Sequence, residues 1–352
     1  MSALSASSAR VSIVVDNFEY ERFLGEAIDS ALAQTHDDVE VLVVDDGSRD
    51  GSRDVIASYG QQVTAVLKDN GGQASAFNAG FAASSGEVVI FLDSDDVLEP
   101  GAAAAAVDEL RRAPYAKLHW PLREVDRDGR PLGTLNPGAP LPEGELRDRV
   151  LERGPGAYAT PPTSGNAFSR SFLERVMPLP EELRLCADAY LYDLAPLFGR
   201  IACVHEPLGR LRRHTSAFGG LGLEDRLEHT LLVQQRARAA LRARCRELGL
   251  EPDEDGWRAH SWPLRQRRAL DALWTVVPRG VPFALADAGT FMMEPPAVPL
   301  APDASAHEVG EAGIRFLVVP WPGFAWLASV RPALGACRVL LETDDLVVLE
   351  LP

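Results

Sequence analysis

Residues 88–96 have the sequence Val-Val-Ile-Phe-Leu-Asp-Ser-Asp-Asp, in which an apolar run ends in a group of carboxylates. Five consecutive apolar residues are typical of a strand that is covered on both faces of a sheet. In open α/β sheets, ligands bind beyond the carboxyl ends of such strands. Carboxylates at this place can hold a divalent cation, and they can equally form a solvated turn that caps the next helix.

The same pattern of a strand followed by a polar residue occurs twice earlier in the chain. Residues 11–15 precede Asp16, and residues 39–44 precede Asp45. The intervals carry helical patterns, at residues 24–32, 52–60 and 72–83. Alternating strands and helices with short connections predict a parallel sheet joined by right-handed crossovers. We therefore expect the polar residues that follow these strands to gather at one edge of that sheet.

Four motifs, taken in their order and spacing, resemble the family 2 glycosyltransferases with the GT-A fold. They are residues 11–15, 43–48, 70–80 and 93–95. The resemblance is strong over about residues 10–100 and weaker to about residue 220. It implies an α/β fold with a Rossmann-like, mostly parallel sheet flanked by helices. It also implies transfer of a sugar from a nucleoside diphosphate to an acceptor hydroxyl, with UDP favoured over dTDP or GDP.

The expected nucleotide site is centred on Asp46, which ends the second strand. A carboxylate there can accept a hydrogen bond from a nucleobase imide, and the resemblance implies that Asp46 binds uracil or thymine. Val15, Lys68, Asp93 and Ser94 are expected to complete the nucleotide site. The alternatives are an Asx turn or N-cap for Asp46 and a solvated loop position for Lys68.

The expected metal ligand is Asp95. The resemblance implies that Asp95 binds Mn²⁺ or Mg²⁺ at the diphosphate, while Asp93 contacts the ribose or the sugar. A cation at this place stabilises the negative charge that grows on the leaving nucleoside diphosphate. His214, in the basic segment 212–216, is a second candidate for a metal or phosphate contact. Its alternative is a surface histidine at the end of a strand.

Inverting sugar transfer needs a general base, for which a carboxylate is the usual group. Asp188 stands where a helical pattern begins, after the loop at residues 178–185. By position it resembles the family segment that carries the catalytic aspartate. Ala187 stands where many relatives have a second acidic residue, and Asp193 lies slightly more than one helical turn further on. The alternative for Asp188 is a helix-terminal carboxylate that the macrodipole favours.

Sugar or acceptor contacts are expected from Asn78 and from the polar loop at Ser164, Gly165 and Asn166. Neither the donor sugar nor the acceptor follows from these motifs. A polysaccharide, a lipid-linked intermediate, a peptide and a small secondary metabolite all fit as acceptors.

Two departures from the family pattern concern the first strand. Asp16 and Glu19 stand where most relatives have proline and asparagine. Two extra carboxylates would repel a diphosphate unless they faced away from it. This leaves open an alternative function, a catalytically degenerate sugar-nucleotide-binding or scaffold module. A nucleotidyltransferase is disfavoured because the amino-terminal part has no glycine-rich, basic phosphate loop.

Composition limits the remaining function classes. The chain has 352 residues, of which 46% are hydrophobic, and a formal net charge of −16. This charge argues against nucleic acid as a partner. No run approaches the roughly 20 apolar residues of a membrane span, and residues 1–10 lack a signal pattern, so we expect a cytoplasmic protein. Four cysteines without metal-binding spacing indicate reduced thiols.

Three parts are expected along the chain. They are a GT-A domain at residues 1–220, a helical linker at 221–261 and a small α/β accessory domain at 262–352. The arginine-rich helix at residues 222–248 either packs on the sheet domain or lies peripherally on the inner face of a membrane. An acidic break is expected at 251–256. The accessory domain is expected to hold strands at 282–286, 316–319, 338–341 and 346–351, a hairpin turn at 342–345 and a helix at 306–312. Its aromatic cluster, Trp321, Phe324 and Trp326, suits either a core or an acceptor ring.

Overall fold

The structure is a computed structural model that describes residues 9–214, 223–286, 297–300, 315–320, 324–330, 334 and 337–351. The chain divides into two compact units. The first consists of residues 1–220 and 233–257, and the second of residues 221–232 and 258–352. The division into a GT-A domain at residues 1–220, a linker at 221–261 and an accessory domain at 262–352 stays a prediction.

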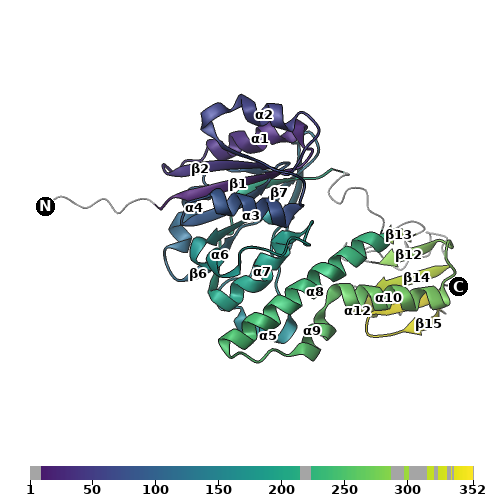
Figure 1. Ribbon diagram of the computed structural model, residues 1–352. Helices are drawn as coiled ribbons and strands as arrows, with labels where there is room; N and C mark the ends of the chain where they lie inside the picture. Colours follow the sequence, from purple (N-terminus) through teal and green to yellow (C-terminus); the bar gives the residue numbers. More distant parts are fainter. Residues whose placement is uncertain are drawn as a thin grey trace. The chain divides into compact units, whose positions relative to one another are not determined.

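A seven-stranded, mostly parallel sheet forms the centre of the first unit (Figure 1). Its strand order is β10-β6-β9-β4-β1-β2-β3. Only β9 runs antiparallel to its neighbours. The strands are β1 (Val11–Asn17), β2 (Val39–Asp45), β3 (Thr64–Leu67), β4 (Val88–Asp93), β6 (Tyr115–His119), β9 (Asn166–Ser169) and β10 (Arg200–Cys203). The predicted α/β fold class is confirmed.

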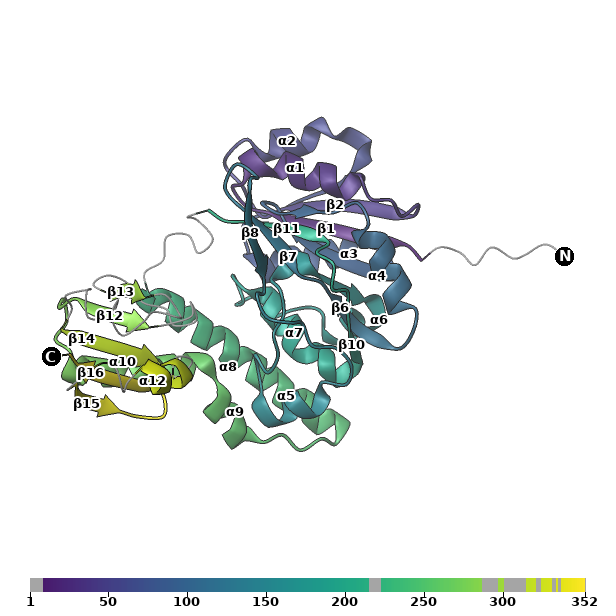
Figure 2. The same cartoon turned by 180° about the vertical axis from the view of Figure 1, so that it is seen from behind.

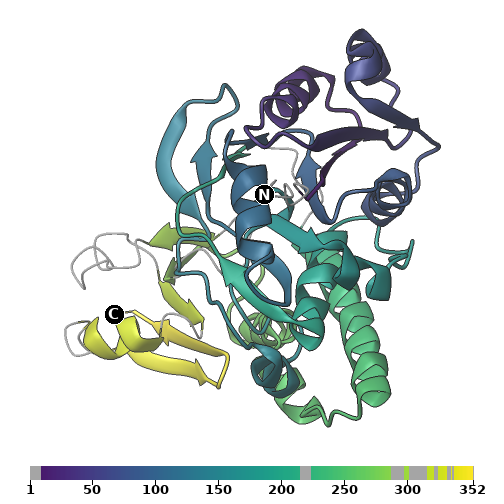
Figure 3. The same cartoon turned by 90° about the vertical axis from the view of Figure 1, so that its left-hand side faces the viewer.

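Helices lie on both sides of this sheet (Figures 1 and 3). Alternate residues of β1 point to opposite faces, so that Ile13 and Val15 belong to one core and Val14 to the other. The first core is covered by α1 (Glu21–Leu32), α2 (Ser52–Ser58) and α4 (Ala102–Leu110). The second is covered by α3 (Gln73–Ala83), α5 (Arg147–Arg153), α6 (Arg170–Val176) and α7 (Ala187–Phe198). Short 3₁₀ turns occur at η1 (Gly60–Gln62) and η2 (Thr163–Gly165).

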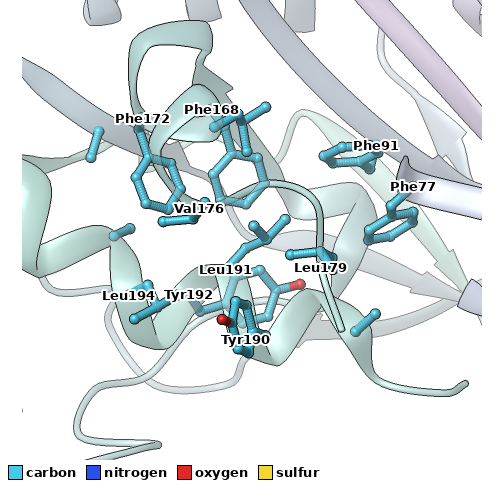
Figure 4. Close-up of a cluster of buried hydrophobic side chains, with 14 of the residues drawn as sticks. Phe77, Phe91, Phe168, Phe172, Val176, Leu179, Tyr190, Leu191, Tyr192 and Leu194 are labelled. Carbon is cyan, nitrogen blue, oxygen red and sulfur yellow. The ribbon is translucent and has the colours of Figure 1, made fainter. Parts of the chain in front are cut away.

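Aromatic rings fill the second core (Figure 4). Phe77 of α3 stacks on Phe91 of β4, with ring centroids 4.2 Å apart. Phe168 of β9 stacks on Tyr192 of α7 at 6.4 Å. These contacts fix α3 and α7 against the strands whose ends form the site described below.

A second, four-stranded sheet was not predicted from the sequence. Figure 2 shows three of its strands side by side. It consists of β5 (Val97–Leu98), β11 (Gly209–Arg212), β7 (Leu122–Val125) and β8 (Pro131–Asn136), in that order. β5 starts directly after Asp96, and β11 ends two residues before His214. The pairing of β5 with β11 therefore brings His214 to the carboxylates at the end of β4.

Two helices, α8 (Leu223–Leu248) and α9 (Glu254–His260), follow the part of the first unit that ends at residue 214. In α8, Val233, Ala237 and Leu241 are buried, while Arg236 and Arg242 pair with acidic residues. This is the pattern of a packing helix with a polar outer face. The predicted break at 251–256 is wrong in part, because Asp253 caps a new helix there through the Gly256 N–H at 2.8 Å. Among the described residues, no helix is both long enough and apolar enough to cross a bilayer.

The second unit contains a five-stranded sheet of order β13-β12-β14-β16-β15. Its elements are α10 (Trp262–Val276), β12 (Phe283–Ala286), β13 (Ala297–Leu300), β14 (Phe316–Pro320), α12 (Phe324–Val330), β15 (Arg338–Glu342) and β16 (Leu346–Glu350). The predicted closing hairpin is confirmed by the antiparallel pairing of β15 and β16. Arg265 and Arg268 of α10 bind the carboxylate of Asp345, which lies in the turn of this hairpin. The helix expected at 306–312, Trp321 and the side chain of Trp326 lie outside the described residues.

Candidate active site

The carboxyl ends of β1, β2 and β4 meet at one edge of the large sheet. Asp16 of β1 is in register with Asp93 of β4, and Asn17 is in register with Asp45 of β2. We call Asp45 and Asp46 the β2 carboxylates. We call Asp16, Asp93, Asp95 and Asp96 the acidic cluster.

Asp46 is 3% exposed and accepts three hydrogen bonds. Its Oδ1 accepts from Lys68 Nζ at 2.5 Å and from the Gly71 N–H at 2.9 Å, and its Oδ2 accepts from the Gly72 N–H at 2.6 Å. Gly72 has a φ of +87°, and a Cβ there would lie 2.6 Å from the Arg184 backbone. Glycine is therefore required for this loop to close on the carboxylate. Lys68 is tied to Asp46 and is not a freely solvated lysine.

Asp45 is also buried and is held by three donors. Asn17 Nδ2 lies 3.0 Å from Oδ1, while Arg53 Nε at 2.7 Å and the Ser48 N–H at 3.2 Å bind Oδ2. Burial alone would raise the pKa of Asp45, but hydrogen bonds from Ser48, Arg53 and Asn17 outweigh it and lower the pKa. For both β2 carboxylates, hydrogen-bond donors of the same chain thus compensate the cost of burying the negative charge.

The acidic cluster has the opposite electrostatics. Ligand oxygens of Asp93, Asp95 and Asp96 lie within 4.8 Å of one another. Burial, followed by the charges of Asp95 and Asp188, raises the pKa of Asp16 well above its ordinary value. Burial and the Asp16 charge do the same for the pKa of Asp93. Asp16 Oδ1 is buried and has no hydrogen-bond partner among the described residues.

Asp96 anchors the loop that carries Asp95. Its Oδ2 accepts from Ser164 Oγ at 2.6 Å, and its Oδ1 accepts from the Arg212 N–H at 3.0 Å. Burial and the Asp95 charge nevertheless raise the pKa of Asp96 to about 8. Arg212 is almost buried and donates from Nε to the Asp95 carbonyl at 2.9 Å. Arg212 was expected only as one of the basic residues of segment 212–216, and its contact with the Asp95 backbone was not predicted.

His214 is brought to Asp95 from the end of β11. Its Nε2 lies 2.6 Å from Asp95 Oδ2, and its ring stacks on Phe23 with centroids 5.4 Å apart. Carboxylate oxygens and an imidazole nitrogen are suitable ligands for Mn²⁺, and the oxygens suit Mg²⁺. The unpartnered Asp16 oxygen and the excess of carboxylates fit a cation in the same place. The acidic cluster can therefore hold a divalent cation.

Asp188 lies in the first turn of α7. Its Oδ2 accepts from Tyr192 Oη at 2.5 Å and from Thr163 Oγ1 at 3.1 Å, and its Oδ1 accepts from the Ala189 N–H at 2.9 Å. Its charge raises the pKa of Asp16 and Asp93 in addition to their burial, which places Asp188 beside the acidic cluster. Helix α7 thus brings the predicted base to the carboxyl edge of the sheet.

Gln73 connects the acidic cluster with the start of α7. Its Nε2 lies 3.4 Å from Asp93 Oδ1, and its Oε1 accepts from the Ala187 N–H at 2.9 Å. Gln73 was not predicted as a site residue, since nothing in a single glutamine at a helix start indicates a contact more than 100 residues away.

The polar loop at residues 163–166 forms hydrogen bonds with the acidic cluster. Ser164 Oγ accepts from the Asp93 N–H at 3.2 Å besides donating to Asp96. A Cβ at Gly165 would lie 2.5 Å from Pro161, so this backbone is closely packed. Asn166 is fully buried and donates to the Pro162 carbonyl at 2.8 Å. A sugar contact for Ser164, Gly165 or Asn166 stays a prediction.

Three other predicted residues contribute little exposed side chain. Asn78 clamps the Leu179 backbone, with hydrogen bonds of 2.9 and 2.7 Å to its carbonyl and N–H. Val15 is fully buried in the core, and Ser94 is 3% exposed. Their roles at a ligand also stay predictions. Of the two departures from the family pattern, Glu19 is exposed, whereas Asp16 belongs to the acidic cluster.

Comparison with known sequences gives a consistent family. The pattern described as Glycosyl transferase family 2 matches residues 12–175. An uncharacterized glycosyltransferase of Nostoc sp. is 37% identical over 210 residues, 58% of this chain and 65% of that protein. A chondroitin synthase of Pasteurella multocida is 38% identical over 123 residues, 34% of this chain and 13% of that protein. The chain thus spans less than two thirds of the length of these curated relatives.

Comparison with solved structures supports the fold. S. aureus TarS, residues 1–349 in complex with UDP-GlcNAc, superimposes with a TM-score of 0.51 at 18% sequence identity. The match covers 74% of this chain and 83% of that one. At this identity the likeness concerns the fold, which is that of GT-A glycosyltransferases. The match at residues 12–175 and the glycosyltransferase relatives support a family 2 glycosyltransferase domain in this chain.

Proposed function

We propose that this protein is a metal-dependent, inverting glycosyltransferase that uses a nucleoside-diphosphate sugar. The observation that carries the proposal is the arrangement at one sheet edge of a buried carboxylate in a glycine loop, an acidic cluster with a histidine, and a helix-terminal aspartate. The first group suits the nucleobase, the second suits the diphosphate, and the third suits the acceptor hydroxyl of one sugar-transfer reaction. The family relationship supports the same reaction class.

The β2 carboxylate Asp46 is proposed to recognise the base. A carboxylate offers about four acceptor positions, and Asp46 uses three of them within the chain. The remaining position on Oδ2 can accept the imide N–H of uracil or thymine, which favours UDP or dTDP over GDP. Lys68 is then placed to add positive charge beside the nucleotide.

Asp95 and His214 are proposed to hold Mn²⁺ or Mg²⁺, with Asp93 beside them. When bound, the ion supplies positive charge against the charge that grows on the leaving diphosphate. Arg212 and Asp96 fix the backbone of Asp95, so that its carboxylate needs little reorganisation to act.

Asp188 is proposed as the general base. The acceptor oxygen forms a bond to the anomeric carbon while the bond from that carbon to the diphosphate oxygen breaks. The electron pair of the broken bond leaves with the nucleoside diphosphate, and the acceptor proton passes to Asp188. Attack opposite the leaving group inverts the anomeric configuration. The acceptor is a hydroxyl compound in bacterial glycan, glycolipid or natural-product biosynthesis.

Isothermal titration with UDP, dTDP and GDP, each with Mn²⁺ and with EDTA, tests the donor site. We expect one nucleotide to bind with Mn²⁺, and we expect Asp95→Ala to abolish that binding. Asp128→Ala is the matched control, because Asp128 is an exposed aspartate with arginine partners. Absence of nucleotide binding under every condition would refute the proposal.

Turnover separates the enzyme from the degenerate binding module. Release of UDP from UDP-GlcNAc, with water as the acceptor, is measured for the wild type and for Asp188→Asn. We expect the variant to bind UDP normally and to lose turnover by about 100-fold or more, the range for a general base. Proton NMR of the released sugar should show the inverted anomer. A wild type that binds the nucleotide and turns over no UDP-sugar would favour the binding module.

A further inference from the structure

Lys117 is a buried lysine that the proposed reaction does not use. It lies in the centre of β6 and is fully buried. Its ammonium nitrogen lies 5.0 Å from the ring centroid of Tyr158 and 4.6 Å from that of Tyr192. It donates a hydrogen bond to Thr160 Oγ1. Burying a lysine is costly unless its donors and charge are compensated, so this position calls for an explanation.

A chain of hydrogen bonds with one direction starts at this lysine. Lys117 donates to Thr160, and Thr160 Oγ1 donates to Asn166 Oδ1 at 3.4 Å. Asn166 Nδ2 lies 3.3 Å from Tyr192 Oη and shares its two hydrogens with the backbone carbonyls of residues 161–163, at 2.8 to 3.3 Å. Tyr192 Oη donates to Asp188 Oδ2 at 2.5 Å. Thr160, Asn166 and Tyr192 each accept from the member before and donate to the next, so the members polarise one another. The chain ends on the carboxylate proposed as the base.

We infer that Tyr192 is the positioning residue that holds the Asp188 carboxylate in its reactive orientation. Lys117, Thr160 and Asn166 support Tyr192 through the chain of hydrogen bonds. The inference rests on the proposed function, in which Asp188 is the base. Tyr192 occupies one oxygen of Asp188 together with Thr163, and the Ala189 N–H binds the other. Asn166, predicted above as a sugar contact, is assigned to this chain because it is fully buried within it.

The surroundings of Lys117 agree with a chain of donors. Burial lowers the pKa of the Lys117 amine well below its ordinary value, and the Asp193 and Asp188 carboxylates and Cys203 oppose this change. Asp193 is buried, and its Oδ1 accepts from the Gly156 N–H at 2.7 Å. In either protonation state the Lys117 amine retains an N–H that can donate to Thr160, so the direction of the chain is kept.

The two tyrosines that face Lys117 give a matched pair of variants. Tyr192→Phe removes the hydroxyl that binds Asp188 and keeps the ring that stacks on Phe168 (Figure 4). Tyr158→Phe also removes one buried hydroxyl beside Lys117, but that hydroxyl donates to the Tyr192 carbonyl at 2.6 Å and not to Asp188. A purely structural role predicts similar losses for the two variants.

The first measurement is the steady-state kinetics of UDP release from UDP-GlcNAc with Mn²⁺. We expect Tyr192→Phe to lower kcat by about 10-fold to 100-fold, the effect of one hydrogen bond to a charged group, with KM unchanged. Tyr158→Phe should stay within about 3-fold of the wild type, as expected for a position outside the charged site. Equal kcat values for the two variants, or a loss confined to KM, would overturn the inference.

The second measurement does not need turnover. Crystal structures of both variants should show the Asp188 carboxylate turned from its position in Tyr192→Phe and unchanged in Tyr158→Phe. An unchanged carboxylate in Tyr192→Phe would also overturn the inference. Asp188→Asn separates the two proposals, because an active Asp188→Asn refutes the base itself. An inactive Asp188→Asn with equal tyrosine variants refutes only the positioning role.

Discussion

The β2 carboxylates and the acidic cluster lie at the same edge of one sheet and differ in how their charge is balanced. Asp45 and Asp46 each have a basic side chain and backbone donors in contact. In the acidic cluster, burial and mutual repulsion raise the pKa of several members, and that of Asp96 reaches about 8. The chain therefore balances the charge of the β2 carboxylates with its own donors. The acidic cluster lacks this balance, so an added cation should stabilise it more.

The largest expected effect comes from breaking the balance at Asp46. Asp46→Ala leaves the Gly71 and Gly72 N–H groups without this acceptor, and the Lys68 ammonium loses its carboxylate partner and keeps the Asp69 carbonyl. We expect the free energy of unfolding to fall by about 3 kcal/mol, as for other buried pairs that lose one partner. Urea unfolding measures this. Lys68→Met is the control and should cost less, because the carboxylate keeps both backbone donors. Equal losses would mean that the ion pair outweighs the glycine loop.

Adding a cation should affect the acidic cluster and not the β2 carboxylates. At pH 8 and about 100 times its dissociation constant, Mn²⁺ should raise the free energy of unfolding by about 2.7 kcal/mol. Denaturant unfolding with and without Mn²⁺ measures this gain. It should disappear in Asp95→Ala and persist in Lys68→Met. A gain that survives Asp95→Ala would place the cation elsewhere.

Without a cation, the acidic cluster should make stability fall as pH rises. A carboxyl group whose pKa is raised on folding contributes stability below its ordinary pKa of 3.8 and loses it as pH passes the folded value. For Asp96 this window runs from 3.8 to about 8. Asp16→Asn removes one like charge and should stabilise the protein at pH 8 by about 1 kcal/mol, the value of one pKa unit. Unfolding in EDTA across this pH range is the measurement, and a destabilised Asp16→Asn would contradict it.

The smallest effect, with the opposite sign, is expected at Asp45. Its pKa is lowered on folding, so its contribution is present above 3.8 and is lost as pH falls through the folded value. Asp45→Asn should lower the free energy of unfolding at pH 7 by about 1 kcal/mol or less, because Arg53 is half exposed. The difference from the wild type should shrink at pH 3. A constant difference across pH would assign it to packing instead of charge.

The sequence predicted the parts of the fold that have strong periodic signals. Residues 11–15, 39–44 and 88–92 are apolar runs, and each forms a strand that is buried on both faces. The small sheet escaped prediction because β5 has two residues and nearly all of β8 is exposed, so that neither shows a hydrophobic pattern. The reversed direction of β9 depends on pairing with β4 and β6, which no local signal encodes.

The site was predictable where chemistry directly follows a strand or begins a helix. Asp46, Asp95 and Asp188 have this kind of signal, and the fold brings all three to one edge. Arg212, Gln73 and Tyr192 do not have it. Each acts through a partner that is distant in the chain or, for Tyr192, through a chain of side chains from three elements. Their roles follow only from the folded arrangement.

The short turn η2 has a consequence for the whole reaction. The hydroxyls of its first two residues donate to two different carboxylates of the site, Thr163 to Asp188 and Ser164 to Asp96. Two neighbouring residues thus fix the spacing between Asp188, the proposed base, and the loop that carries Asp95, the proposed metal ligand. Inserting one residue between them would change this spacing without removing any chemical group. In the proposed reaction, a single peptide unit therefore fixes the distance between the side of the sugar where the new bond forms and the side where the old bond breaks.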